Sequence, residues 1–96
     1  MRLSDYRPVS KLRLPEHIID KPRFGVVDAH NHLGPIFSQG WHVRPVPELL
    51  AALDDAGVET IVDLDGGQGD FFSEHYAKYA GAHPTRFAHV AQLAYE

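Results

Sequence analysis

Apolar residues along the chain fall into short blocks that alternate between the spacing of strands and the spacing of helices. Apolar runs occupy residues 24–29 and 60–64, and residues 86 to about 93 are typical of a third strand. The nearly continuous apolar character of the first run indicates a parallel strand that is covered by helices. We therefore predict strands at these three positions, the second of them buried.

The segment between the first two runs has helical spacing instead. Between residues 45 and 56 one face carries an apolar residue every three or four positions, namely Val46, Leu49, Leu50, Leu53 and Ala56. Pro45 and Pro47 stand near its start, where a missing N–H does little harm. Gly57 follows its last residue, as glycine often does after a helix. These features predict a helix that packs on the strands.

A second helix is predicted from Asp70, as its N-cap, to about Ala80, before Gly81. One of its faces carries Phe72, His75, Tyr76 and Tyr79. The aromatic side chains on this face indicate core packing rather than a cofactor site. We interpret His75 as a surface or packing residue. His89, in the third strand, faces either the pocket or the layer of helices, and the sequence leaves both alternatives open.

The predicted order is strand, helix, strand, helix, strand, which argues for an α/β fold built of parallel βαβ units. Residues 1–23 form an extended lead-in, because Pro8, Pro15 and Pro22 exclude long helices and central strands there. Residues 24–96 make up the remaining, folded part of the chain.

Composition and charge exclude several classes of protein. The formal net charge of the 96 residues is -4, and no basic stripe marks a nucleic-acid binder. No apolar run approaches the roughly 20 residues that span a bilayer, and the start has no signal-peptide core. The chain holds no cysteine, so disulfides and thiolate metal sites are excluded. We expect a cytoplasmic protein without nucleic-acid or membrane partners.

Candidate chemistry lies directly after the first predicted strand, where His30 and His32 are separated by one residue. In an extended strand such residues share a face and stand about 7 Å apart, so that two imidazoles reach one metal ion. A bare pair of this kind is common by chance. Its position at the end of a strand, before a loop with Gly34, favours a metal site.

Residues 27–34, Val-Asp-Ala-His-Asn-His-Leu-Gly, resemble the first-strand motif of the amidohydrolase-related family. Members of this family are (β/α)8-barrel metalloenzymes, both hydrolases and non-oxidative decarboxylases such as the aminocarboxymuconate-semialdehyde decarboxylase type. The lead-in and residues 56–67, Ala-Gly-Val-Glu-Thr-Ile-Val-Asp-Leu-Asp-Gly-Gly, are also similar to those of one bacterial branch. The resemblance covers essentially the whole chain.

The resemblance implies that the chain is the first three strands and two helices of a (β/α)8 TIM barrel, for which about 250 residues are typical. It implies that His30 and His32 bind a divalent metal, with zinc as the first choice and manganese as the second. The remaining ligands of the family come from later strands, which this chain lacks. The implied reaction is hydrolysis or decarboxylation of a small carboxylated or cyclic substrate.

Four further residues are candidates for the same site, each with a structural alternative. Asp28 either orients His30 and faces the substrate, or is bonded to the backbone. Asp65 follows the second strand at the end where barrels keep their active sites, and it either contacts substrate or caps the loop. Trp41 and His42, in the loop after the first strand, either line a pocket or cover the top of the fold.

Two other functions compete with the metal-dependent enzyme. One is a non-catalytic fragment that needs a complementing chain, forms a homo-oligomer or has no function, because three strands leave an open face and unpaired edges. The other is a TatD-like metal phosphoesterase or nuclease, whose barrel also begins with a His-x-His pair. The Tyr-Arg-Pro lead-in and the Asp-Gly-Gly strand end argue against the second.

Overall fold

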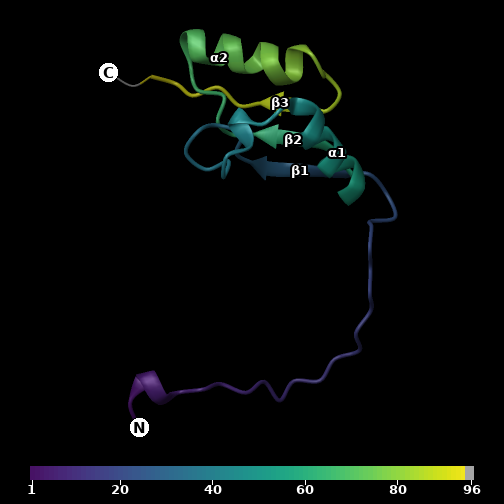
Figure 1. The fold of residues 1–96 in the computed structure, drawn as a ribbon, viewed down its shortest axis with the longest axis vertical. Coiled ribbons are helices and arrows are strands. Elements are labelled where there is room, and N and C mark those ends of the chain that lie inside the picture. The colour runs from purple at the N-terminus through teal and green to yellow at the C-terminus, as the bar shows by residue number, and fades with distance from the viewer. Residues whose placement is uncertain (95–96) are drawn as a thin grey trace.

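The computed structural model describes residues 1–94 and shows a three-stranded parallel sheet with two α-helices, reached by a long extended lead-in (Figure 1). In chain order the elements are η1 (Leu3–Asp5), β1 (Val26–Asn31), η2 (Trp41–Val43), α1 (Val46–Ala56), β2 (Val58–Asp63), α2 (Gly69–Tyr76), η3 (Ala77–Gly81) and β3 (Phe87–His89). The predicted order of strands and helices is therefore confirmed.

The sheet has the order β1-β2-β3, with β2 in the centre and both pairings parallel. Ile61 is paired with Phe87 and Asp63 with His89, so that the ends of β2 and β3 lie level. Residues 1–94 form an open α/β sheet rather than a closed barrel. The carboxyl ends of all three strands lie at the same end of the sheet, where the predicted residues His30, His32 and Asp65 come together.

One hydrophobic cluster lies between the sheet and the helical segments. Ile61 of β2 and Phe87 of β3 belong to it, together with two leucines of α1. Its buried members are Leu33, Leu49, Leu53, Ile61, Tyr79, Ala80 and Phe87. Because α1 packs on β2 and the turn η3, which continues α2, packs on β3, the helical segments meet the sheet through this one cluster.

Strand β1 differs from the prediction, which placed a buried strand at residues 24–29. It runs from Val26 to Asn31, and the side chain of Val27 is left 57% exposed. The physical reason is that the helical segments pack on β2 and β3, which supply the strand residues of the buried cluster, and leave β1 uncovered. The expectation of a strand at residues 24–29 that is covered by helices was wrong.

The ends of the helices follow the sequence signals in part. Helix α1 begins at Val46 and ends at Ala56, and Gly57 caps it with a φ of 74°, the left-handed conformation that favours glycine. Helix α2 does not begin at Asp70, because Gln68 is its N-cap and Asp70 lies within the first turn. It continues as the π-helical turn η3, so that helical structure extends to Gly81 as expected.

Strand β3 is shorter than predicted, because its ladder with β2 ends at His89. Beyond it the chain still follows β2. The N–H of Val90 donates to the carbonyl of Asp63 at 2.9 Å, and the N–H of Gln92 donates to the carbonyl of Gly67 at 2.8 Å. The predicted extended course is thus kept after regular pairing stops.

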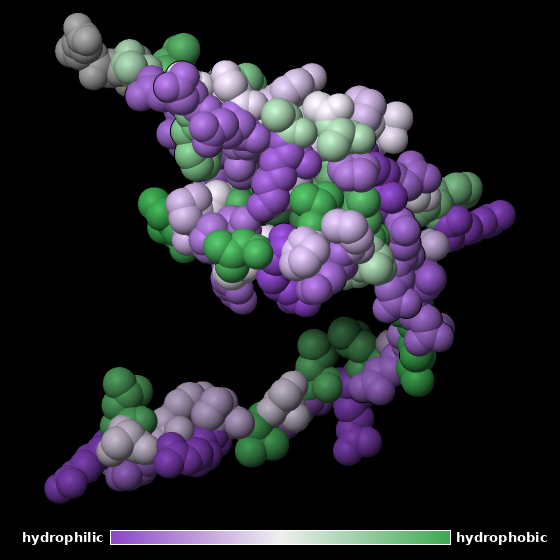
Figure 2. Space-filling view, turned by 45° about the horizontal axis from the view of Figure 1, so that its top comes forward, coloured by the Kyte–Doolittle hydropathy of each residue, from purple (hydrophilic) through white to green (hydrophobic). Residues whose placement is uncertain are grey.

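The lead-in runs away from the folded part and then turns, so that the N-terminus lies apart from the sheet (Figure 1). After η1 it contains no helix or strand up to β1. Its apolar side chains are exposed and follow one another along the segment (Figure 2): Leu3, Tyr6, Val9, Leu12, Leu14, Ile18 and Ile19. An exposed apolar segment of this length offers contact area to another surface.

Candidate metal centre

The carboxyl ends of the three strands bring histidines and aspartates together. His30 lies near the end of β1 and His32 just after it, Asp63 ends β2 with Asp65 two residues later, and His89 ends β3. Because parallel strands all run in the same direction, their last residues lie together at the carboxyl end of the sheet. The side chains there form two groups that have different surroundings.

The first group is the histidine pair. The centroids of the His30 and His32 rings lie 5.3 Å apart, with the rings edge to face. His30 is exposed and His32 is half-buried, with its ring 5.1 Å from that of Phe37. The two imidazoles therefore stand side by side at the surface, as the alternation along a strand predicts.

Asp65 fixes one member of this pair. Its Oδ1 lies 2.8 Å from Nδ1 of His32, and its Oδ2 accepts the backbone N–H of Gly34 at 3.0 Å. An ionised carboxylate only accepts, so Nδ1 of His32 carries the proton and Nε2 keeps its lone pair. Metal-bound histidines are commonly held by a carboxylate in this way. Asp65 thus both caps the loop after β1 and orients His32.

Trp41 is the second loop residue that the structure brings to the pair. Together with His30, His32 and Phe37 it lines an open depression of about 300 Å³. The guanidinium of Arg44 lies 3.9 Å above its ring, which holds the indole in place by a cation–π contact. An apolar ring beside two imidazoles is a suitable wall for a small substrate.

His42 does not line that depression. Its Nδ1 lies 2.9 Å from the hydroxyl of Ser38, and its carbonyl accepts the ammonium of Lys78 at 2.6 Å. It lines instead a neighbouring depression of about 230 Å³ that reaches His75. The structure therefore separates Trp41 from His42, although they are adjacent in sequence.

Asp28 turns its carboxylate back onto its own strand. Oδ1 accepts the backbone N–H of His30 at 3.1 Å, and Oδ2 accepts the side-chain amide of Asn31 at 2.7 Å. The register between β1 and β2 shifts between Asp28 and Asn31, so simple alternation does not hold across this stretch. Asp28 supports the backbone that carries the histidines.

The second group, Asp63, His75 and His89, was not predicted as a site. Oδ2 of Asp63 lies 2.7 Å from Nε2 of His75 and 2.7 Å from Nδ1 of His89. The side chains are exposed by only 0% for Asp63, 8% for His75 and 1% for His89. His75 is thus buried, and its role exceeds the packing that the sequence suggested.

Four hydrogen bonds surround the carboxylate of Asp63. Its Oδ1 accepts the backbone N–H groups of Leu33 at 2.8 Å and Asp65 at 3.1 Å, while the two imidazoles take Oδ2. Burial alone would raise the pKa of Asp63. The hydrogen bonds from His89, from the two backbone N–H groups and from His75 outweigh burial and lower the pKa from 3.8 to about 2.

This buried group can hold a metal ion. Each of the three side chains offers one ligand atom, and these atoms all lie within 4.8 Å of one another. Two nitrogens and a carboxylate oxygen form a donor set that zinc accepts. Each ligand comes from a different element, β2, α2 or β3, so that an ion there would join all three.

A signal for this group was present in the sequence. Asp63 follows the buried Ile61 by two residues, and His89 follows the buried Phe87 by two residues. Residues two apart on a strand share a face, so both polar side chains point toward the helices rather than to solvent. His75 precedes the buried Tyr79 by four residues, which places it on the buried face of the helix.

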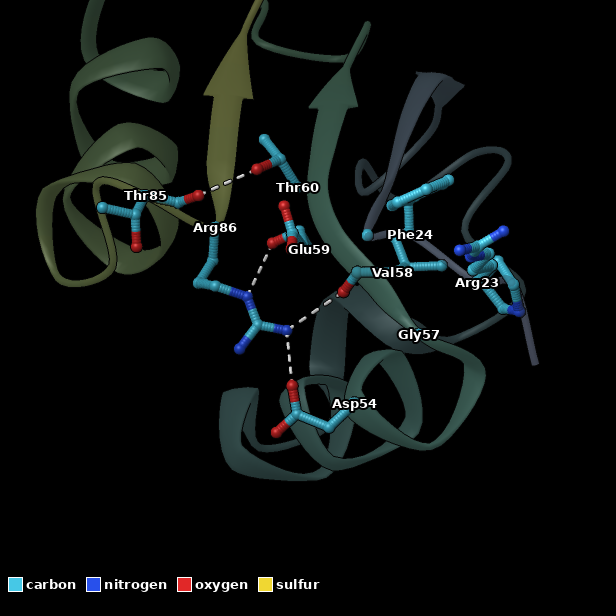
Figure 3. A pocket seen from close by; sticks show the side chains of 11 residues that line it. Arg23, Phe24, Asp54, Gly57, Val58, Glu59, Thr60, Thr85 and Arg86 are labelled. Atoms are coloured by element: carbon cyan, nitrogen blue, oxygen red, sulfur yellow. Dashed lines mark hydrogen bonds and ion pairs between the residues drawn. The ribbon is translucent and has the colours of Figure 1, made fainter.

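A larger depression, of about 530 Å³, lies at the opposite end of the sheet, where the strands begin (Figure 3). There Arg86 donates to Asp54 at 2.7 Å, to the carbonyl of Glu59 at 2.7 Å and to that of Val58 at 3.2 Å. The hydroxyl of Thr60 donates to the carbonyl of Thr85 at 2.9 Å. These contacts tie helix and strands together, as is usual at this end of such folds.

Comparison with known proteins gives no further guidance, because no protein family, no curated protein and no solved structure matches the chain. Within residues 1–94, no helix has the length and apolar character that a membrane crossing requires.

Proposed function

We propose that the chain is the opening section of a metal-dependent enzyme related to the amidohydrolases, with a (β/α)8 barrel completed by further βα units. The enzyme would act on a small carboxylated or cyclic substrate, by hydrolysis or by non-oxidative decarboxylation. The parallel sheet with helical segments packed on it and an open edge at β1 supports this proposal, because a barrel begins in that way.

The observation that carries the proposal is the contact of His32 with Asp65. The carboxylate accepts a hydrogen bond from Nδ1 and leaves Nε2 as the ligand atom, and the two imidazole rings lie with their centroids 5.3 Å apart. A pair of histidines of which one is oriented by a carboxylate is the usual start of a catalytic zinc site. Manganese is the second choice for the ion.

The chain's own residues would divide the work at this site. His30 and His32 would supply two nitrogen ligands, and Asp65 would keep His32 in the tautomer that binds metal. Trp41 would form one side of the depression that takes the substrate. A bound zinc ion supplies a water of pKa about 7 and polarises a carbonyl or carboxylate. A catalytic zinc takes three protein ligands, so at least one more ligand would come from outside this chain.

The test is equilibrium dialysis of the chain against Zn²⁺ at a series of fixed free concentrations, because two imidazoles alone hold zinc too weakly to keep it in metal-free buffer. Bound metal is measured by mass spectrometry for the wild type and for three variants. His30→Ala and His32→Ala should each remove one equivalent of zinc. Asp65→Asn should weaken binding by about 10- to 100-fold, because an amide holds the ring less firmly. His17→Ala, in the lead-in, is the control. Unchanged metal content in both histidine variants would refute the assignment.

A phosphoesterase of the TatD type would begin with the same histidine pair. The chemical test is to assay cleavage of a phosphodiester and release of CO2 or hydrolysis of a carboxylated substrate in parallel. Phosphodiester cleavage alone would replace the proposed reaction with that one.

We also propose that the chain binds a second copy of itself through the lead-in. Residues 1–23 carry six Lys or Arg and three Asp or Glu, whereas residues 24–96 carry three and ten. The lead-in is therefore cationic as well as apolar, and the folded part is acidic. A surface of opposite charge on a second copy would attract it. The exposed strand β1 adds an unpaired edge.

Analytical ultracentrifugation tests this association. The wild type should sediment as a dimer or larger species, and Arg7→Glu combined with Arg13→Glu should shift it toward monomer. Arg44→Glu, which reverses a charge on the folded part, should not weaken the association. A compact monomer that melts cooperatively at low salt would overturn this proposal.

A further inference from the structure

We propose that Asp63, His75 and His89 form a second metal site, which binds one Zn²⁺ ion in the interior of the fold. This site is distinct from the pair His30 and His32, shares no ligand with it and does not depend on the function proposed above.

The first argument is the convergence of the donors. Nε2 of His75 and Nδ1 of His89 both aim at one oxygen of Asp63, each at 2.7 Å. Three side chains from three elements are thus arranged around a single point. A tetrahedral zinc ion with bonds of roughly 2.1 Å needs its ligand atoms about 3.4 Å apart. Small rotations of the two imidazoles would provide that room.

The second argument is that Asp63 is already held in the orientation of a ligand. Two backbone N–H groups, of Leu33 and Asp65, fix Oδ1, which leaves Oδ2 as the oxygen that faces the imidazoles. Ligand carboxylates in metal sites are commonly supported by hydrogen bonds of this kind. The carboxylate is thus positioned whether or not an ion is bound.

The third argument concerns two polar atoms beside the cluster. Nε2 of His89 and the hydroxyl of Tyr79 are buried and have no hydrogen-bond partner among residues 1–94. The Tyr79 ring packs against both imidazoles, at 5.0 Å from His75 and 6.0 Å from His89. Buried polar atoms without partners are rare. A zinc-bound water would be the partner that the Tyr79 hydroxyl lacks, whereas Nε2 of His89 would carry the ring proton and stay unpaired.

One ligand of the site borders the surface. His75 lines the depression of about 230 Å³ together with His42, Glu74 and Lys78. Its side chain is also the most exposed of the three ligands. We infer a structural ion, since it would join β2, α2 and β3 in the covered part of the fold.

The experiment separates this site from the histidine pair by working with His30→Ala combined with His32→Ala. Co²⁺ is titrated into the metal-free chain and followed by its visible absorption, with competition by a chelator. One Co²⁺ per chain should bind with the intense bands of a four-coordinate ion. Adding His75→Ala should weaken binding at least 100-fold, whereas adding His83→Ala should leave it unchanged. Absence of binding, or binding that His75→Ala leaves intact, would overturn the proposal.

A second measurement needs no further variant. In the same double-alanine chain, the ring ¹⁵N resonances of the histidines are recorded before and after addition of Zn²⁺. Those of His75 and His89 should shift to positions typical of metal-bound nitrogens, while those of His17 should stay in place. Shifts confined to other histidines would refute the site. If instead the site proposed at His30 and His32 fails, the wild type should still bind one ion.

Discussion

The ionisation of Asp63 should govern how the metal-free protein responds to acid. Its pKa is lowered from 3.8 to about 2 in the folded state. A group whose folded pKa is depressed contributes stability above its unfolded pKa, and this contribution disappears as the pH falls through the folded value. This lowering of the pKa corresponds to about 2 kcal/mol of stability of the folded state. This stabilisation should be complete above pH ~5 and lost between pH ~4 and pH ~2.

The perturbation is Asp63→Asn, and the assay is urea unfolding in the presence of a chelator, followed by the fluorescence of Trp41, the one tryptophan of the chain. The advantage of the wild type over the variant should shrink by about 2 kcal/mol between pH 5 and pH 2. Asp55→Asn, at an exposed position on α1, should show no such change. A gap between wild type and Asp63→Asn that stays constant over this range would refute the reasoning.

Two further changes test the packing around the cluster and the turn after α1. Tyr79→Phe removes a buried hydroxyl that has no partner among residues 1–94, so the metal-free chain should gain about 1 kcal/mol in urea unfolding; a loss of that size would show that the hydroxyl is hydrogen-bonded. Gly57→Ala should destabilise the chain by about 1–2 kcal/mol through its φ of 74°, and further because the new Cβ would lie 2.9 Å from the side chain of Pro22. Gly40→Ala, at a φ of 90° with open space around it, measures the backbone strain alone; equal losses in both variants would show that the contact with Pro22 is unimportant.

The elements of the fold could be predicted because each carries a local signal. Helix α1 has its apolar face, a proline in the first turn and Gly57 at its end, and all three act within one segment. The N-cap of α2 was misplaced at Asp70, since Gln68 occupies that position without a side-chain capping bond. Local patterns do not identify a cap that uses no capping side chain.

The exposure of β1 and the grouping of Asp63 with His75 could not be predicted as readily, because both depend on contacts between segments far apart in the sequence. An apolar run predicts a strand, but its burial depends on which strands the helices cover. Asp63 and His75 meet only when α2 packs on the end of β2. The pairing of Asp63 with His89 adds the register of two strands, which is a property of the sheet.

The two oxygens of Asp63 serve different parts of the molecule. Oδ1 holds the N–H of Leu33, the residue directly after His32, whereas Oδ2 holds the two buried imidazoles. An ion that pulls on Oδ2 would therefore act on the loop that carries His32, and the affinities of the two proposed sites would be thermodynamically linked. Linkage is reciprocal, so zinc at either site would change the affinity of the other by the same factor. Titration of the wild type should then deviate from two independent binding steps.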